Sequence, residues 1–252
     1  MIHYIRLVLL CLTLLSFSLF SSNALADPWK FEIAPYAWAL NMNGHVSEGP
    51  VTLTVNQHFT DLLEHLDGAG MLYASAHKNA FGFYFNGLYS SLSNSQQIHT
   101  INTSGNTQYT VLDGGVSYIV FQHEFNHDRN LSLEPYAGVR YTNNNTKLTI
   151  GGISLERNVD WIDPVVGMRF NYSFNKKWLA YLIGDIGGTS SSTQYSYSAG
   201  AFLGYQPKSW NTAILYLGYR ILDQYYQTGS GLNYYNWNMK LFGPVVGLGC
   251  RF

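Results

Sequence analysis

Residues 242–252 read FGPVVGLGCRF, and their polarity alternates along the chain. Counting back from Phe252, the even-numbered residues are mostly apolar, whereas the odd-numbered residues are mostly small or charged and end in Arg251. A period of two is that of a β-strand, whose side chains point alternately to the two faces of a sheet. The run covers about eleven residues, the length of a tilted strand that crosses a bilayer, whereas strands of soluble proteins have about five or six. The stretch therefore predicts a transmembrane β-strand.

The N-terminal segment predicts export. Arg6 supplies a short positive region, residues 7–20 are apolar, and Ala24-Leu25-Ala26 fits a cleavage site of small residues. We therefore expect residues 1–26 to be a cleaved signal peptide and residues 27–252 to form one domain. No later run approaches the roughly 18 apolar residues that indicate a membrane-spanning helix.

The composition favours a membrane barrel over a soluble enzyme. Charged residues make up 12% of the chain, which also contains 20 Tyr and 24 Gly; an ordinary soluble domain has about 25% charged residues. Few charges with much Tyr and Gly suit a barrel that has a lipid-facing side, aromatic girdles and a crowded interior. A secreted β-sandwich is the alternative. The net charge of −1 predicts no nucleic-acid partner.

The connections between the predicted strands alternate between two kinds. Short polar turns lie at 78–80, 126–130, 175–177 and 207–209, and longer Asn-, Ser- and Gly-rich loops lie at 41–70, 95–107, 143–158, 188–194 and 223–234. Short periplasmic turns opposite long extracellular loops are typical of outer-membrane barrels. Ten strands result, at 29–40, 71–78, 81–94, 108–124, 131–142, 159–174, 178–187, 195–206, 210–222 and 235–252. We assign 51–55 to an extracellular hairpin; a barrel of eight strands is the alternative.

Most charged residues in the predicted strands lie at the alternate positions that face the lumen. The acidic ones are Glu32, Asp113, Glu134, Asp163 and Asp185, and the basic ones are Arg140, Arg169, Arg220 and Arg251. On the lipid face such charges would cost about 2–4 kcal/mol each near the bilayer centre. Because the two signs are nearly balanced, we expect them to pair and, with Tyr side chains, to fill the lumen. A narrow selective path through them is the alternative. We also expect Arg251 to pair with Glu32 where the barrel closes.

The first long loop contains the polar group His58, Asp61, Glu64 and His65. Asp61 followed three residues later by Glu64 predicts a capping box of a short helix. Asp61 and His65 lie four residues apart, as metal ligands can on a helix. Two such residues do not make a site, and the neighbouring leucines explain the helix without a metal. We therefore predict that the protein binds no metal and no cofactor. His58, Asp61, Glu64 and His65 are only weak candidates for metal ligands.

Enzyme motifs do not occur in the sequence. It has no G-x-S-x-G, H-E-x-x-H, P-loop or paired-cysteine pattern. We therefore predict a non-enzymatic protein. The alternative is an outer-membrane protease or lipid-modifying enzyme with a site at the extracellular rim.

Several stretches together resemble a known group. They are residues 29–36 (WKFEIAPY), 59–63 (FTDLL), 163–169 (DPVVGMR), 218–223 (GYRILD) and 243–252 (GPVVGLGCRF). The chain resembles the proteobacterial outer-membrane β-barrel proteins, namely the opacity-type surface antigens and the OmpA- and OmpW-like small barrels. The resemblance implies a Gram-negative outer-membrane location and contacts with membrane lipid and lipopolysaccharide. It also implies that Phe252 is the signal read by the barrel-assembly machinery. Cys250 departs from the aromatic residue usual at its position.

The expected function is that of a non-enzymatic surface barrel with a structural, adhesive or narrow, porin-like channel role. The sequence does not identify a surface ligand.

Overall fold

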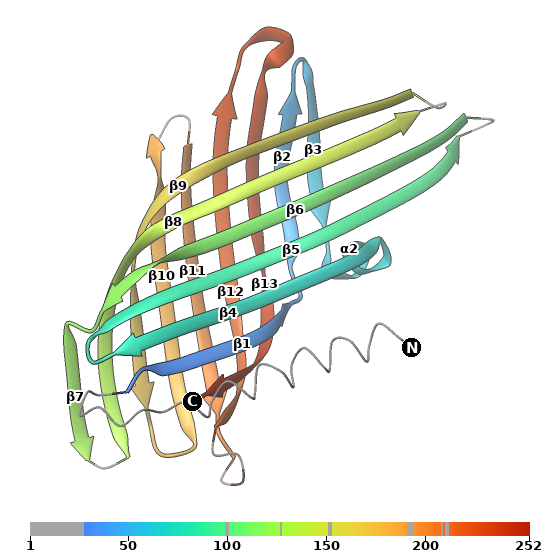
Figure 1. Ribbon diagram of the computed structural model, residues 1–252. Helices are drawn as coiled ribbons and strands as arrows, with labels where there is room; N and C mark the ends of the chain where they lie inside the picture. Colours follow the sequence, from blue (N-terminus) through green and yellow to red (C-terminus); the bar gives the residue numbers. More distant parts are fainter. Residues whose placement is uncertain are drawn as a thin grey trace.

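The computed structural model describes residues 28–98, 101–126, 128–150, 153–190, 194–207, 209 and 212–252. The expected signal peptide at 1–26 lies outside the described residues. Ten strands form a closed antiparallel barrel (Figure 1). Around the barrel they are β1 (Lys30–Trp38), β4 (Leu66–Lys78), β5 (Phe81–Ile98), β6 (Ile101–Tyr118), β8 (Arg129–Ile150), β9 (Ile153–Ser173), β10 (Trp178–Ser190), β11 (Gln194–Tyr205), β12 (Ala213–Thr228) and β13 (Tyr235–Arg251). The prediction of ten strands is confirmed, and the alternative of eight is wrong.

The ring closes where β1 pairs with β13. The register places Glu32 opposite Arg251 and Ile33 opposite Cys250. β1 is short and ends at Trp38, so the upper part of β13 pairs instead with β2 (Asn41–Glu48). β3 (Val51–Gln57) pairs with β2 and forms an edge of the sheet. The expectation that 51–55 belongs to a hairpin outside the ten spanning strands is therefore confirmed.

The assignment of 95–107 and 143–158 as loops is wrong, because most of their residues form paired strands, and the loop predicted at 41–70 contains β2, β3 and the start of β4. β5 and β6 remain paired out to Ile98 and Ile101, and β8 and β9 remain paired out to Ile150 and Ile153 (Figure 1). Polar residues dominate 95–107 and 143–147, so no long apolar row marks these segments as strands, although Leu148, Ile150, Ile153 and Leu155 alternate with polar residues. Similarly, β12 and β13 remain paired up to Thr228 and Tyr235, with a short 3₁₀ helix, η2 (Gly231–Asn233), at the tip.

The strand predicted at 108–124 is broken. β6 ends at Tyr118, and β7 (Phe121–Asn126) pairs only with β8. The chain stays apolar across the break, which explains the error, but the exposed apolar residues change there from even positions (Val116, Tyr118 and Val120) to odd positions (Phe121 and Phe125). β7 and the first part of β8 form a small hairpin at the periplasmic end.

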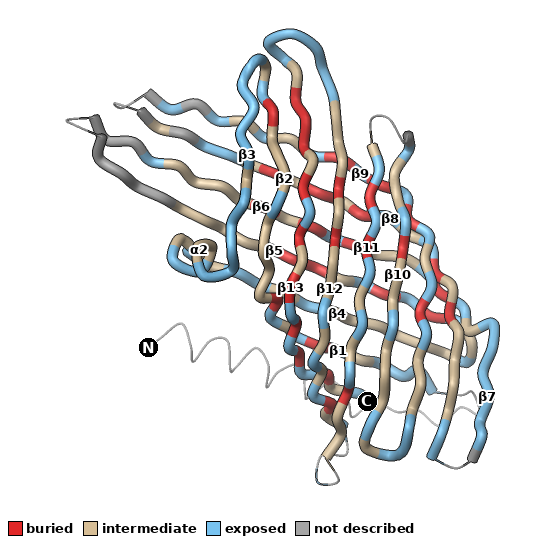
Figure 2. The backbone as a smooth tube through the Cα atoms, turned by 180° about the vertical axis from the view of Figure 1, so that it is seen from behind, coloured by how far each residue is buried: buried red, intermediate tan, exposed pale blue. Residues whose placement is uncertain are grey.

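The predicted faces of the spanning strands are confirmed by exposure. Phe83, Val166 and Leu217 are exposed on the outside of the barrel, whereas the inward row of β13 is buried along most of its length (Figure 2). Within the described ranges, no helix is long and apolar enough to cross a membrane.

Candidate functional site in the barrel lumen

The extracellular half of the lumen is filled by apolar and aromatic side chains. We call this cluster of buried residues the plug; its members are Trp38, Leu88, Tyr109, Val111, Trp161, Leu222, Tyr235, Trp237, Met239, Leu241 and Val245. They project from β1, β5, β6, β9, β12 and β13, that is, from strands on all sides of the ring. Tyr109 and Tyr235 agree with the expectation that Tyr side chains fill the lumen, but the expectation of paired charges is wrong for this half.

Contacts between opposite walls close the plug. β6 and β12 lie on opposite sides of the ring, and the Tyr109 hydroxyl of β6 donates a hydrogen bond to Gln224 Oε1 of β12 at 2.5 Å. Gln224 Nε2 in turn donates to Thr142 Oγ1 of β8 at 2.8 Å. The rings of Tyr109 and Trp237 stack with centroids 5.5 Å apart. Through these contacts, side chains from opposite sides of the barrel meet in the middle of the lumen.

An ion cluster lies directly below the plug. Arg140 is 1% exposed and bridges two carboxylates, with Nε 2.6 Å from Asp113 Oδ1 and Nη2 2.8 Å from Asp185 Oδ1. Its Nη1 donates to Ser196 Oγ at 3.1 Å, and the Tyr136 hydroxyl donates to Asp185 Oδ2 at 2.8 Å. One guanidinium thus joins strands β6, β10 and β11 to its own strand, β8.

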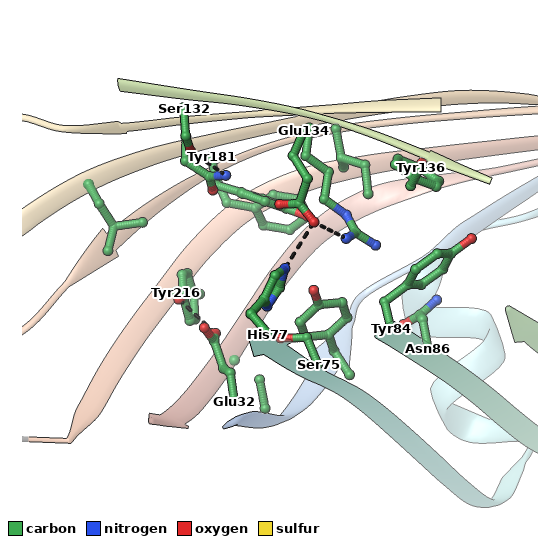
Figure 3. Close-up of a pocket in the computed structure, with 18 of the residues that line it drawn as sticks. Glu32, Ser75, His77, Tyr84, Asn86, Ser132, Glu134, Tyr136, Tyr181 and Tyr216 are labelled. Carbon is green, nitrogen blue, oxygen red and sulfur yellow. Dashed lines mark hydrogen bonds and ion pairs between the residues drawn. The ribbon is translucent and has the colours of Figure 1, made fainter. Parts of the chain in front are cut away.

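A second ion cluster lies closer to the periplasm and is centred on Glu134 (Figure 3). Arg169 Nη1 and His77 Nε2 each lie 3.0 Å from the same oxygen, Oε1 of Glu134. The guanidinium carbon of Arg169 lies 4.3 Å from the ring centre of Tyr84 and 4.5 Å from that of Tyr136. The two rings hold the guanidinium by cation–π attraction and restrict its orientation.

The periplasmic mouth has a third cluster at the closing strands. Arg251 Nε lies 2.7 Å from Glu32 Oε2, and its Nη2 donates to the Tyr216 hydroxyl at 3.0 Å. Tyr216 donates to Glu32 Oε1 at 2.8 Å. The structure thus contains the expected ion pair between β1 and β13.

The remaining two charges of the predicted network differ from each other. Arg220 reaches Asp113 Oδ2 at 3.8 Å and lies over the Trp38 ring at 5.1 Å. Asp163 is fully buried and points inward as expected, yet no ion pair of it is found within the described ranges. Its Oδ1 accepts a hydrogen bond from Gln194 Nε2 at 2.7 Å. Parity therefore placed Asp163 on the correct face but could not identify its partner.

Below the plug the lumen contains a cavity of about 730 Å³. It extends from the Arg140 cluster to the periplasmic mouth, where Lys30, Asn79 and Phe252 line it. Its walls also carry apolar side chains, among them Ile183. The periplasmic half of the lumen is therefore charged but not filled, whereas the extracellular half is filled but not charged.

The weak metal candidates lie outside the lumen, around the short helix α2 (Phe59–Glu64) between β3 and β4. The predicted capping box is shifted: His58 precedes the helix and donates its backbone N–H to Asp61 Oδ2 at 3.0 Å, so Glu64 is the last helical residue. His65 Nδ1 lies 2.8 Å from the backbone oxygen of Asp61. In the part of the chain that the structure describes, no group of three or more potential metal ligands occurs.

Arg157 makes extracellular contacts that were not predicted from the sequence. From the outer part of β9 it reaches Glu48 Oε1 at 3.1 Å and the backbone oxygen of Asn233 at 3.2 Å. Its guanidinium carbon lies 5.5 Å from the ring centre of Tyr235, a plug residue. Arg157 thus ties three extracellular segments together above the plug. No local pattern in the sequence indicates this pairing, because the partners are far apart along the chain.

Comparison with known proteins shows the fold. No protein-family model matches the chain, and no curated protein matches it in sequence. Among solved structures, the chain is similar to the outer membrane protease OmpT from Escherichia coli, with a TM-score of 0.59 and 8% identity over 92% of this chain and 99% of that one. The fold is that of the small outer-membrane β-barrels. An outer-membrane location in a Gram-negative cell agrees with this fold.

Two further structures match at lower TM-scores. The attachment invasion locus protein Ail of Yersinia pestis has a TM-score of 0.37 and 13% identity, covering 89% of this chain and 98% of that one. Neisserial surface protein A has a TM-score of 0.31 and 10% identity, covering 90% of this chain and all of that one. At these TM-scores and identities, neither likeness carries an argument about this barrel.

Proposed function

We propose that the protein is a non-enzymatic barrel of the outer membrane whose lumen does not conduct ions and which acts at the cell surface in a structural or adhesive role. A signal peptide at 1–26 directs its export, and the barrel-assembly machinery reads Phe252. Membrane lipid and lipopolysaccharide surround its apolar outer face.

The plug is the observation that carries the proposal. A conducting barrel needs a continuous polar path, whereas here aromatic side chains from opposite walls touch at the level of Tyr109 and Trp237. Water is excluded from an apolar, close-packed region of this kind. Narrow channel function is therefore the least supported of the three predicted roles.

The extracellular extensions support a role at the surface. β8 and β9 continue as a paired ribbon, in which Asn143 Nδ2 donates to Asn158 Oδ1 at 2.6 Å and Asn145 Nδ2 donates to Glu156 Oε1 at 3.2 Å. Paired strands present side chains in a fixed arrangement, as a contact surface requires. Arg157 further ties this ribbon to the β2–β3 hairpin through Glu48.

Single-channel recording of the refolded protein in planar bilayers tests the proposal. We expect no stable ion steps at moderate voltage while the protein still shows the heat-modifiable gel shift of a folded barrel. Reproducible steps from protein shown to be folded would contradict it.

A further inference from the structure

We propose that the periplasmic cavity is a binding site for a small organic carboxylate with an apolar body, and that Arg169 holds its carboxylate. The proposal goes beyond the non-conducting surface barrel proposed above.

Arg169 has donors that the protein does not use. The residue is 1% exposed, and its Nη1 donates a hydrogen bond to Glu134 Oε1 at 3.0 Å. Within the described part of the chain, Nε and Nη2 have no hydrogen-bond partner. A buried guanidinium ordinarily has its donors satisfied, so two unpartnered donors on one side chain that lines a cavity point to a missing acceptor.

The two unused donors fit one kind of acceptor. Nε–H and the adjacent N–H of Nη2 lie on the same edge of the planar guanidinium and point in the same direction. A carboxylate presents two oxygens at the matching spacing and accepts both hydrogen bonds at once. The Tyr84 and Tyr136 rings hold the guanidinium in place, which lowers the entropic cost of meeting such a ligand.

Among the described residues, no carboxylate around the cavity occupies this edge; both nitrogens are enclosed, so an entering carboxylate must displace the side chains that cover them. Its lining contains four carboxylates and four arginines, which are Glu32, Asp113, Glu134, Asp185, Arg140, Arg169, Arg220 and Arg251. Each of these carboxylates already contacts an arginine. Glu134 moreover contacts both Arg169 and His77, so Arg169 is not the only partner of its negative charge.

The rest of the cavity suits an apolar body. Leu179, Ile183 and Phe202 line it together with Tyr181, whose hydroxyl lacks a partner within the described ranges. A volume of about 730 Å³ falls within the range of roughly 300–1,000 Å³ typical of small-molecule sites. Because the plug closes the other end, the ligand enters from the periplasm.

Calorimetry on the full barrel in lipid nanodiscs tests the site with 4-phenylbutyrate as the probe. 4-Phenylbutyramide is the matched neutral compound, with the same body and no carboxylate. We expect saturable binding of the acid and about tenfold weaker binding of the amide, because the amide cannot accept two charge-assisted hydrogen bonds. Equal affinities, or no saturable binding of the acid, would overturn the proposal.

Variants separate the site from general effects of charge. Arg169→Lys keeps the positive charge but removes the two-donor edge, and we expect it to weaken binding of the acid about tenfold. Arg157→Lys changes an arginine outside the cavity and should leave binding unchanged. Leu179→Trp places a larger side chain in the cavity at a position whose register partner on β9 is Ser173 and not Arg169, and it should abolish binding. The heat-modifiable shift shows which variants are folded. A folded Arg169→Lys or Leu179→Trp variant that binds like the wild type would refute the assignment. The conductance test is independent, since a silent barrel is expected whether or not the acid binds.

Discussion

The extracellular and periplasmic halves of the lumen are occupied by different kinds of side chain. In both halves, every second side chain of the ten strands points into the interior of the barrel. The extracellular half uses apolar packing and contains no ion pair among its plug residues, whereas the periplasmic half uses arginine–carboxylate contacts around a cavity. Apolar side chains of many shapes can interdigitate until no space remains. Ion pairs need specific distances and directions, so they hold the walls apart at fixed positions and leave space between them.

The largest effect is expected from removing the arginine at the boundary between the two halves. Arg140→Met leaves Asp113 and Asp185 buried without their shared partner, and we expect it to lower the free energy of unfolding by about 5 kcal/mol, the upper end for a broken buried ion pair. Urea unfolding of the barrel in lipid vesicles measures this loss. Arg157→Met is the control, because its ion pair with Glu48 is more exposed and should contribute at most about 1 kcal/mol. Similar losses in both variants would show that burial of the Arg140 cluster is not what matters.

A somewhat smaller loss is expected from opening the plug. Trp237→Ala removes an indole that stacks on Tyr109, and we expect it to cost about 3–4 kcal/mol in unfolding free energy because a cavity remains. The same variant should show brief ion steps in planar bilayers. Trp178→Ala removes an indole from the exposed outer face near the periplasmic end and should leave the barrel silent. If the two variants behave alike in conductance, the plug is not the seal.

The smallest effect is expected at the closing strands. Arg251→Met breaks the ion pair with Glu32, but the Arg251 side chain is half-exposed, so solvent already screens the interaction. We expect a loss of about 1 kcal/mol, seen as a small downward shift in the temperature at which the heat-modifiable band disappears. A loss as large as that of Arg140→Met would mean that closure of the ring depends on this pair.

The alternation of apolar and polar residues allowed the lipid-facing and lumen-facing sides of the spanning strands to be predicted from sequence, because lipid requires apolar side chains at every second position of such a strand. It also predicted that Arg140 and Asp163 point inward. The assignment of 51–55 to a hairpin followed instead from the even number of spanning strands. Beyond the membrane this demand ends. The mostly polar residues 143–150 and 153–158 were therefore predicted to be a loop, although they form paired strands.

One pattern in the sequence indicates apolar side chains in the lumen. Trp237, Met239 and Leu241 share the parity of Arg251 and therefore face the lumen. That signal shows apolar side chains inside but not whether they meet others across the barrel. The partners of Asp163 and the free edge of Arg169 depend on distances between strands that are remote along the chain, and no local pattern encodes those distances.

The most direct test of the divided lumen is labelling of a cysteine in the cavity from each side of the membrane. Asn171→Cys, in a Cys250→Ser background, places a thiol on the cavity wall below the plug. A membrane-impermeant maleimide should leave this cysteine unlabelled in intact cells and label it once the outer membrane is permeabilised to give access to the periplasm. Labelling of intact cells at a comparable rate would contradict a lumen sealed on its extracellular side.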